Sequence, residues 1–139
     1  MSGLFSFNIF DKKQTMMQKE NFKPGGIIFM TTRTMDSLHV FYTKRIGAEL
    51  WLDQGACRIY RFGNMLFGFC KGDEPSVDGV ITFFYPSSEE VDEMYLRLKE
   101  QATTKVKTNE KFRIYHFYAE DPEGRSIEFQ YFNHELKAF

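Results

Sequence analysis

Apolar positions along the chain follow two different periods, and these periods occur in the same order twice. Ile27 to Thr32 is a run of apolar and β-branched residues, which is typical of a buried strand. In residues 35–46 apolar side chains recur at helical spacing, and Gly47 follows as a C-terminal cap. Thr34 or Asp36 can serve as the N-cap. Three further strands are predicted at residues 48–53, 57–62 and 65–70.

The same order returns in the second half of the chain. Residues 79–85 form an apolar strand, and a helix is predicted to begin at Ser87 or Ser88. Its apolar face consists of Val91, Met94, Tyr95 and Leu98. Three more strands are predicted at residues 103–108, 112–119 and 125–132. A turn over residues 121–124, Asp-Pro-Glu-Gly, separates the last two strands.

These elements make two strand-helix-three-strand units, over residues 26–71 and 79–132, with a polar linker at 72–78 and a short C-terminal tail. The length of 139 residues fits one domain, which we place at residues 24–139. Residues 1–23, which end in a Pro-Gly breaker cluster, are predicted to be an extension that is flexible or docks on a partner subunit. Its candidate docking residues are Phe5, Phe7, Ile9 and Phe10.

Composition restricts the partners and the location. A net charge of −1 and a pI near 6.3 argue against a nucleic-acid or anionic-membrane partner. No apolar run approaches the roughly 18 residues of a transmembrane helix, and the N-terminus lacks the basic segment and cleavage site of a signal peptide. We therefore expect a cytoplasmic location. Sixteen Phe, seven Tyr and one Trp predict a Phe-packed core, an aromatic ligand pocket, or both.

The two cysteines are predicted to lie opposite one another. Gly63-Asn64 is typical of a two-residue hairpin loop, and pairing outward from it sets Cys57 against Cys70, with Cβ atoms roughly 5 Å apart. Without a signal peptide or a C-x-x-C pattern, reduced thiols packed as small hydrophobic side chains are the first expectation. An oxidisable pair is the alternative.

Three short motifs resemble the vicinal oxygen chelate superfamily of glyoxalases, bleomycin-resistance proteins and dioxygenases. Phe41-Tyr42 with Ile46-Gly47 is similar to the end of the superfamily's first helix, and residues 91–99 are similar to its second. Residues 121–129, Asp-Pro-Glu-Gly-Arg-Ser-Ile-Glu-Phe, resemble its last turn and strand most specifically. The resemblance covers about residues 27–132. It implies an α+β fold in which tandem βαβββ units form a cup-shaped, partly open mixed β-sheet barrel with the helices outside, and it implies a homodimer.

Superfamily members that use a metal place a His on the first strand of each unit and a Glu, Gln or His on the last strand of each. The last of these positions is Glu128. The other three fall near Ile27, in residues 80–83 and near Phe67, where no ligand residue occurs. One carboxylate among apolar side chains would hold a divalent ion weakly. We therefore predict no bound metal and no cofactor.

Period-2 alternation divides each strand into two faces, of which one should line the cup. The residues assigned to the cup are Phe29, Arg58, Tyr60, Met65, Phe67, Phe69, Ser126, Glu128 and Gln130. The opposite faces, with Cys57, Ile59, Leu66, Gly68 and Cys70 in the first unit and Ile127, Phe129 and Tyr131 in the second, should pack under the helices. The predicted ligand-binding residues are Glu128, Gln130, Arg58, Tyr60, Phe67, Phe69 and Phe29.

Three functions stay open at this level. The first is a metal-free protein that binds an aromatic or amphipathic small molecule in the cup. The second is a lyase, isomerase or hydrolase in which Glu128 acts as general base, with His116 or Tyr60 as its proton partner. Glu128 is the first catalytic candidate and His116 the second. The third is an interaction domain whose cup is filled by its own side chains.

Overall fold

The computed structural model of the chain describes residues 23–138, so the predicted extension and its candidate docking residues lie outside the described residues. The strands in chain order are β1 (Ile28–Thr32), β2 (Glu49–Asp53), β3 (Cys57–Phe62), β4 (Met65–Lys71), β5 (Val80–Phe84), β6 (Lys107–Asn109), β7 (Ile114–Glu120) and β8 (Ser126–Phe132). The helical segments are α2 (Met35–Val40), its π-helical continuation η2 (Phe41–Ile46), and α3 (Ser88–Arg97).

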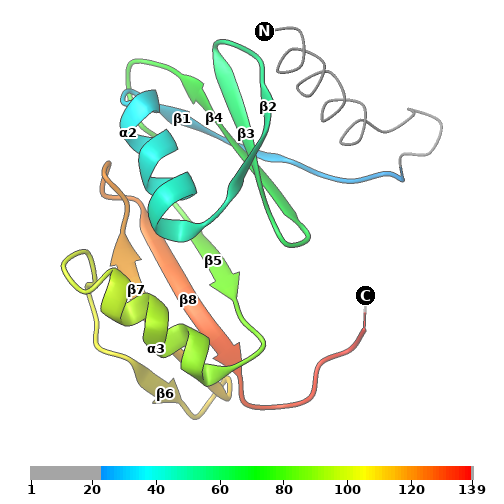
Figure 1. Cartoon of the computed structure of the whole chain (residues 1–139), viewed down its shortest axis with the longest axis vertical. Helices are drawn as coiled ribbons and strands as arrows, with labels where there is room; N and C mark the ends of the chain where they lie inside the picture. Colours follow the sequence, from blue (N-terminus) through cyan, green and yellow to red (C-terminus); the bar gives the residue numbers. More distant parts are fainter. Residues whose placement is uncertain (1–22, 139) are drawn as a thin grey trace, which may run out of the picture.

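The two predicted units are confirmed as two four-stranded sheets with the same topology (Figure 1). Their strand orders are β1-β4-β3-β2 and β5-β8-β7-β6. In each sheet the first strand of the unit pairs in parallel with its last strand, and the remaining neighbours are antiparallel. Each sheet is open, and one helix covers one face of each. The predicted α+β class with tandem βαβββ units and outer helices is therefore confirmed.

Most predicted element bounds hold within one or two residues, but two local features differ. The first helix is predicted as one α-helix and instead continues as a π-helical segment before Gly47, which adopts φ 92°. Strand β6 is shorter than predicted and begins at Lys107. Ahead of it, the N–H groups of Thr103 and Thr104 both donate to the carbonyl of Tyr118, so this stretch meets the sheet without extended pairing.

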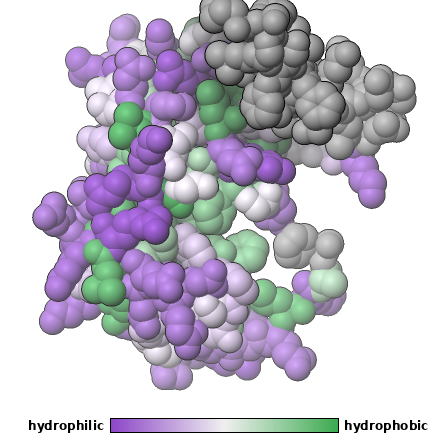
Figure 2. Space-filling view, in the orientation of Figure 1, coloured by the Kyte–Doolittle hydropathy of each residue, from purple (hydrophilic) through white to green (hydrophobic). Residues whose placement is uncertain are grey.

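Capping and side-chain spacing explain helix α3. Ser87 is its N-cap, since its hydroxyl accepts from the backbone N–H of Glu90 and donates to the Glu90 carboxylate. The buried residues Val91 and Met94 face strands β7 and β8. The outer surface over the helices is largely hydrophilic (Figure 2). The first helix has no comparable cap, because the Thr34 side chain makes no capping hydrogen bond.

One apolar core extends through both units. The ring of Phe83, on β5, lies 4.9 Å from that of Phe62 and 6.0 Å from that of Phe67, both in the first unit. It stacks on Phe129 of β8 at 5.4 Å. Aromatic pairs at these centroid separations add to the stabilisation that burial of their area provides. The two units therefore share one apolar core.

A buried arginine also joins the units. Arg125, 1% exposed, donates to the Asp121 carboxylate at 2.6 Å, and its guanidinium lies 5.0 Å from the ring of Phe69. It further donates to the backbone carbonyls of Thr31 and Ser76. The carbonyls belong to the first unit and the linker, whereas Asp121 lies in the turn before β8. The motif that carries the family resemblance therefore has a structural role in this chain.

Glu123 makes the fold sensitive to acid. Burial would raise the pKa of Glu123, but the backbone N–H of Arg33, the Thr32 hydroxyl and the Arg125 charge outweigh burial and lower it from 4.5. Such a carboxylate stabilises the folded state above the unfolded pKa, and the contribution disappears as pH falls through the lower folded pKa. We expect the free energy of unfolding to fall more steeply below about pH 4.5 in the wild type than in Glu123→Gln. Urea titrations at neutral and acidic pH measure this; parallel pH curves would contradict it.

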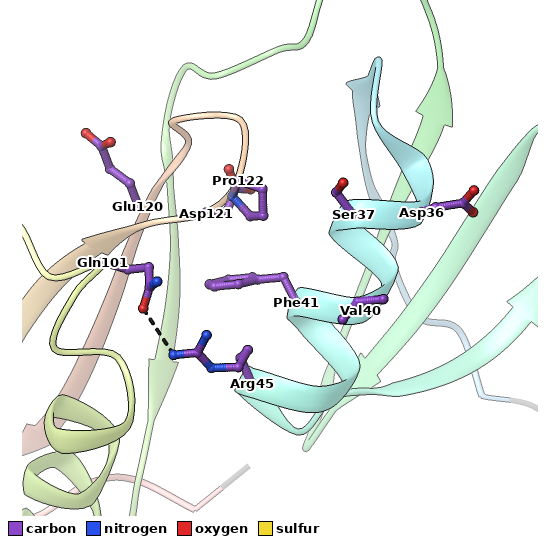
Figure 3. A pocket seen from close by; sticks show the side chains of 9 residues that line it. All are labelled: Asp36, Ser37, Val40, Phe41, Arg45, Gln101, Glu120, Asp121 and Pro122. Carbon is purple, nitrogen blue, oxygen red and sulfur yellow. Dashed lines mark hydrogen bonds between the residues drawn. The ribbon is translucent and has the colours of Figure 1, made fainter.

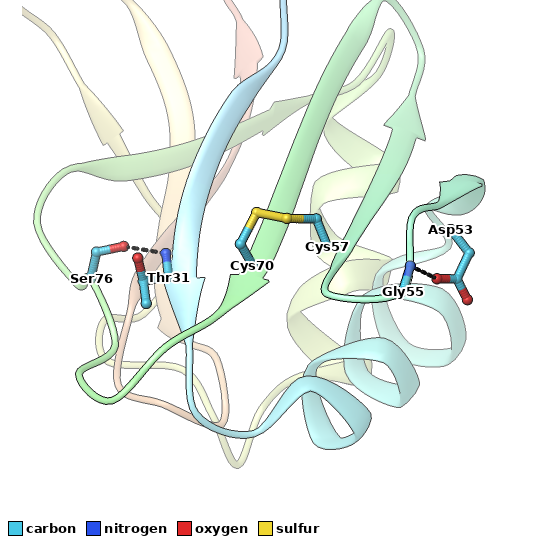
Figure 4. Close-up of a disulfide and its surroundings, with 6 residues drawn as sticks. All are labelled: Thr31, Asp53, Gly55, Cys57, Cys70 and Ser76. Carbon is cyan, nitrogen blue, oxygen red and sulfur yellow. Dashed lines mark hydrogen bonds between the residues drawn. A yellow bond between two sulfur atoms is a disulfide. The ribbon is translucent and has the colours of Figure 1, made fainter.

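The two cysteines are opposite one another, as the predicted hairpin register requires, and their sulfur atoms are bonded (Figure 4). The structure therefore contains the oxidised pair that was the alternative prediction, and the first expectation, of reduced thiols, is wrong. The disulfide links β3 and β4 across a separation of 13 residues. Both half-cystines are half-buried. A cross-link of this kind restricts the unfolded chain and so favours the fold.

Among the described residues, none of the helices is both long and apolar enough to cross a membrane.

Candidate functional site

The predicted orientation of the first hairpin is wrong. Tyr60, Phe67 and Phe69 are between 0 and 1% exposed and pack under the first helix, where the ring of Tyr42 lies 5.4 Å from Phe67 and 5.2 Å from Phe69. The prediction had placed the small side chains of this hairpin under the helix. The large rings are there instead, because burying them removes the most apolar surface from water and fills the space below the helix.

The polar residues of this hairpin also face the helix. The Tyr60 hydroxyl lies 2.8 Å from Nδ1 of His39, a residue of α2. Arg58 forms ion pairs with Asp36 of α2 at 3.3 Å and with Asp53 at 3.7 Å. Arg58 and Tyr60 are therefore held by the helix and do not lie on the concave face.

Phe29 lies on the opposite face from Phe67 and Phe69. It pairs with Gly68, and its ring would lie 2.8 Å from a Cβ atom at that position. Gly68 therefore makes room for the Phe29 ring against the sheet. The ring remains 48% exposed, so Phe29 is the one residue of the predicted first-unit set on the face without the helix.

In the second unit the predicted alternation is confirmed. Ile127 and Phe129 are fully buried on the helix side, and Glu128 and Gln130 point to the other face. His116 of β7 pairs with Gln130 and lies on the same face. The three polar residues are between 3 and 8% exposed, which is unusual for a carboxylate unless it has partners.

Glu128 has two close partners. Its Oε1 accepts from the Thr82 hydroxyl at 2.8 Å, and its Oε2 lies 2.7 Å from Nδ1 of His116. Burial and the adjacent Glu128 carboxylate raise the pKa of Tyr118, its cross-strand neighbour, so that phenol stays protonated at neutral pH. We call Thr82, His116, Tyr118 and Glu128 the polar cluster. Its side chains come from three adjacent strands, β5, β8 and β7.

Two cavities adjoin Thr82 of this cluster, in the space between the first sheet and strand β5, which we call the seam. One, of about 250 Å³, lies between β1, β4 and β5. Its lining residues include Ile28, Met30, Met65, Phe67, Val80 and Thr82. The other, of about 350 Å³, lies between the β3–β4 turn and β5, and it also contacts Met65, Thr82 and Phe84. Thr82 therefore borders both cavities while its hydroxyl binds Glu128.

A larger hollow of about 700 Å³ lies elsewhere, between the first helix and the second unit (Figure 3). It is an open groove beside Phe41, and Arg45 crosses it to donate to the Gln101 side chain at 3.1 Å. None of the predicted site residues lines it. Its polar groups are mostly exposed or already paired, so the buried polar cluster beside the seam is the better candidate site.

The residues present do not fit the metal centre of the superfamily. Register places Thr82 opposite Glu128 in the second unit and Phe29 opposite Gly68 in the first. Of these four residues only Glu128 has a side chain that is a strong ligand for a divalent ion. Within residues 23–138 no group of three His, Cys, Asp or Glu residues is arranged to hold a metal. Glu128 is therefore the one strong ligand among these four positions of the superfamily's metal centre.

Sequence reasoning missed Thr82, Phe84 and Tyr118. Thr82 and Phe84 alternate with the buried Ile81 and Phe83 along β5, so period-2 alternation places them on the face of Glu128. A prediction of that alternation for β5, as was made for β8, would have found them. Tyr118 required the β7–β8 register, which follows from the turn between these strands.

No protein-family model matches the sequence, and no curated protein matches it significantly. Solved structures do resemble the fold. A lactoylglutathione lyase from Agrobacterium tumefaciens has a TM-score of 0.64 at 20% identity, over 78% of this chain and 95% of that one. A glyoxalase/bleomycin resistance protein/dioxygenase from Nocardioides has a TM-score of 0.65 at 14% identity, over 96% of this chain and 97% of that one. A possible glyoxalase from Bacillus cereus has a TM-score of 0.60 at 25% identity, over 78% of this chain and 98% of that one.

These structures share the fold over nearly their whole length, although their sequences differ greatly from this one. The repeated sheets and the turn before Glu128 had indicated the same superfamily. The chain therefore has the fold of the glyoxalases, bleomycin-resistance proteins and dioxygenases, the vicinal oxygen chelate superfamily that its sequence resembles.

Proposed function

We propose that this protein binds a small aromatic or amphipathic molecule, without a metal ion, in the seam beside the polar cluster. The observation that supports this most is the position of Thr82, which borders both seam cavities and donates its hydroxyl hydrogen to Glu128. An apolar space next to a few polar groups is the usual composition of a small-molecule site.

The size and lining of the seam favour a ligand with one or two rings. The cavities measure about 250 and 350 Å³, whereas a dry cavity of about 150 Å³ is enough for benzene. Phe62 and Phe84 offer aromatic edges and faces, and Met65 offers an adaptable thioether wall. Unfilled space of this kind counts against an interior filled entirely by the protein's own side chains.

Indole tests the proposal, with the methionine methyl groups as reporters. We expect it to shift the NMR signals of Met30 and Met65, which line the seam, and to leave those of Met35 and Met94 in the core unchanged. Val80→Phe should narrow the seam and weaken binding at least several-fold. Val77→Phe is its matched control, because Val77 is similarly exposed and does not line either cavity. Unchanged methyl signals at millimolar indole would contradict the proposal.

We further propose that the protein forms a homodimer through the first sheet. Its edge strand β2 exposes Leu50, Trp51 and Leu52 by 40 to 45%, and Phe29 is exposed on the face without the helix. Apolar side chains gathered at a sheet edge and on a bare face are typical of an interface.

The single tryptophan reports on this interface. We expect the fluorescence emission of Trp51 to move to shorter wavelength as protein concentration rises. The fraction of dimer measured by sedimentation should rise over the same range of concentration. Leu52→Lys should abolish both changes, since it would place a charge in the interface. Leu96→Lys should not, because Leu96 lies on helix α3 and is 71% exposed. A monomer at all concentrations from micromolar to millimolar would refute the dimer.

The cytoplasmic location expected from the sequence stays a proposal. The Cys57–Cys70 disulfide argues against that location, because most protein disulfides persist only in oxidising compartments.

A further inference from the structure

His116 has one ring nitrogen with a partner and one without. Nδ1 lies 2.7 Å from the Glu128 carboxylate. Nε2 is buried and has no hydrogen-bond partner among the described residues. The residue as a whole is 3% exposed. Buried polar atoms in folded proteins nearly always have partners, so a buried one that lacks a partner requires an explanation such as a ligand.

The contacts of Glu128 indicate where the hydrogen of His116 lies. An ionised carboxylate only accepts hydrogen bonds, so the short contact with Glu128 requires a hydrogen on Nδ1. A second hydrogen on Nε2 would create a buried cation with an unpaired N–H group. A neutral ring leaves only an unused lone pair there, which costs less than an unpaired donor. The ring is therefore assigned the neutral Nδ1–H form, with Nε2 as an acceptor.

Glu128 itself is poorly placed to act as the base. Its Oε1 already accepts from Thr82 and its Oε2 from His116. Each carboxylate oxygen therefore already has one donor, which holds the group in place, whereas Nε2 of His116 has no partner among the described residues. The sequence-based order, with Glu128 as first catalytic candidate and His116 as second, stays a prediction, and the unpartnered Nε2 is the reason to take His116 first here.

We propose that Nε2 of His116 accepts a hydrogen bond from the hydroxyl group of a bound small molecule, and a proton when that hydroxyl is acidic, while Glu128 holds the ring in the Nδ1–H form. The inference rests on the proposed function and names the ligand class as hydroxyl-bearing aromatics, such as phenols. In a transfer the ligand O–H bond breaks, Nε2 gains the proton, and the ligand becomes an oxyanion. The imidazolium that forms is stabilised by the Glu128 carboxylate.

Imidazole nitrogen NMR of the ligand-free protein tests the assignment directly. We expect His116 to show a protonated Nδ1 and an unprotonated Nε2 at neutral pH, with the half-buried His134 of the C-terminal tail as an internal comparison. Glu128→Gln should keep this form, because the amide oxygen can accept from Nδ1–H. Glu128→Leu should lose it, and this difference identifies Glu128 as a positioning residue. An imidazolium, or an Nε2–H ring, in the wild type would overturn the inference.

Phenol and its methyl ether anisole form a matched pair of probes, since both are aromatic and only phenol can donate a hydrogen bond. We expect both probes to shift the Met65 methyl signal. Only phenol should shift the nitrogen NMR signal of Nε2 of His116, because only phenol can donate a hydrogen bond to it. Equal effects of the two probes on Nε2, or a shift at Met65 with none at Nε2, would overturn this inference and leave the proposed function standing. No shift at either residue with either probe would overturn both.

Discussion

Replacing Arg125 by Met is expected to lower the free energy of unfolding by about 3–5 kcal/mol. The side chains of Arg125 and Asp121 are 1% and 0% exposed, so the substitution would leave the Asp121 carboxylate charged and buried without its cation. The backbone carbonyls of Thr31 and Ser76 would also lose their donor. Methionine keeps much of the length of the arginine stem, so lost packing on Phe69 contributes less than the lost charge. Urea unfolding followed by circular dichroism measures the change.

Arg61→Met is the matched control. Arg61 pairs with Glu49 at 2.9 Å, but the two side chains are 53% and 69% exposed, so losing the pair should have an effect below about 1 kcal/mol. The double variant Arg125→Met/Asp121→Asn should recover part of the loss, because asparagine removes the unpaired charge. If Arg125→Met and Arg61→Met were equally stable, the buried ion pair would not join the units in the way described.

Much of the fold could be predicted from the sequence because its strongest signals are local. The apolar periods, the Gly-Asn loop and the Asp-Pro-Glu-Gly turn each depend on a few neighbouring residues, and they place the strands and the register of Cys57 with Cys70 correctly. The π-helical turn before Gly47 has no such signal, because its hydrogen bonds depend on how the helix meets its sheet.

The faces of the first hairpin could not be predicted in the same way. Alternation separates Tyr60, Phe67 and Phe69 from Gly68 correctly, but it does not say which set faces the helix. In β8 the charged Glu128 between apolar neighbours settles the choice, whereas in β4 both sets are apolar or small. The answer depends on the volume that the helix leaves to be filled, and on a Phe29 ring that needs a glycine beneath it. Of the polar cluster, Glu128 and His116 could be predicted from the sequence and Thr82 and Tyr118 were not. Thr82 becomes a partner of Glu128 only through the parallel pairing of β5 with β8.

Phe83→Ala is expected to destabilise the protein by about 3–5 kcal/mol, the usual cost of removing a buried phenylalanine ring. Phe83 is 1% exposed and contacts Phe62, Phe67 and Phe129. Its neighbour Phe84 provides the control, because it lies on the same strand, points to the other face and is 41% exposed. Phe84→Ala changes strand propensity as much as Phe83→Ala does, and it should lower the free energy of unfolding by about 1 kcal/mol. Denaturant titrations of the two variants separate packing from propensity.

The same pair of variants tests whether the two units unfold together. Because Phe83 belongs to the second unit and packs on two rings of the first, its loss should lower amide hydrogen-exchange protection in β4 and β8 by the same free energy. Phe84→Ala should lower protection in β4 by only about 1 kcal/mol, the smaller loss of stability expected for that variant, since its ring contact is with the half-buried Phe132. Loss of protection confined to β5 and β8 in Phe83→Ala would mean that each sheet has its own stability. A seam between two independently opening sheets would then be a mobile boundary, and it could not hold Thr82 and Glu128 in the fixed arrangement that a ligand site requires.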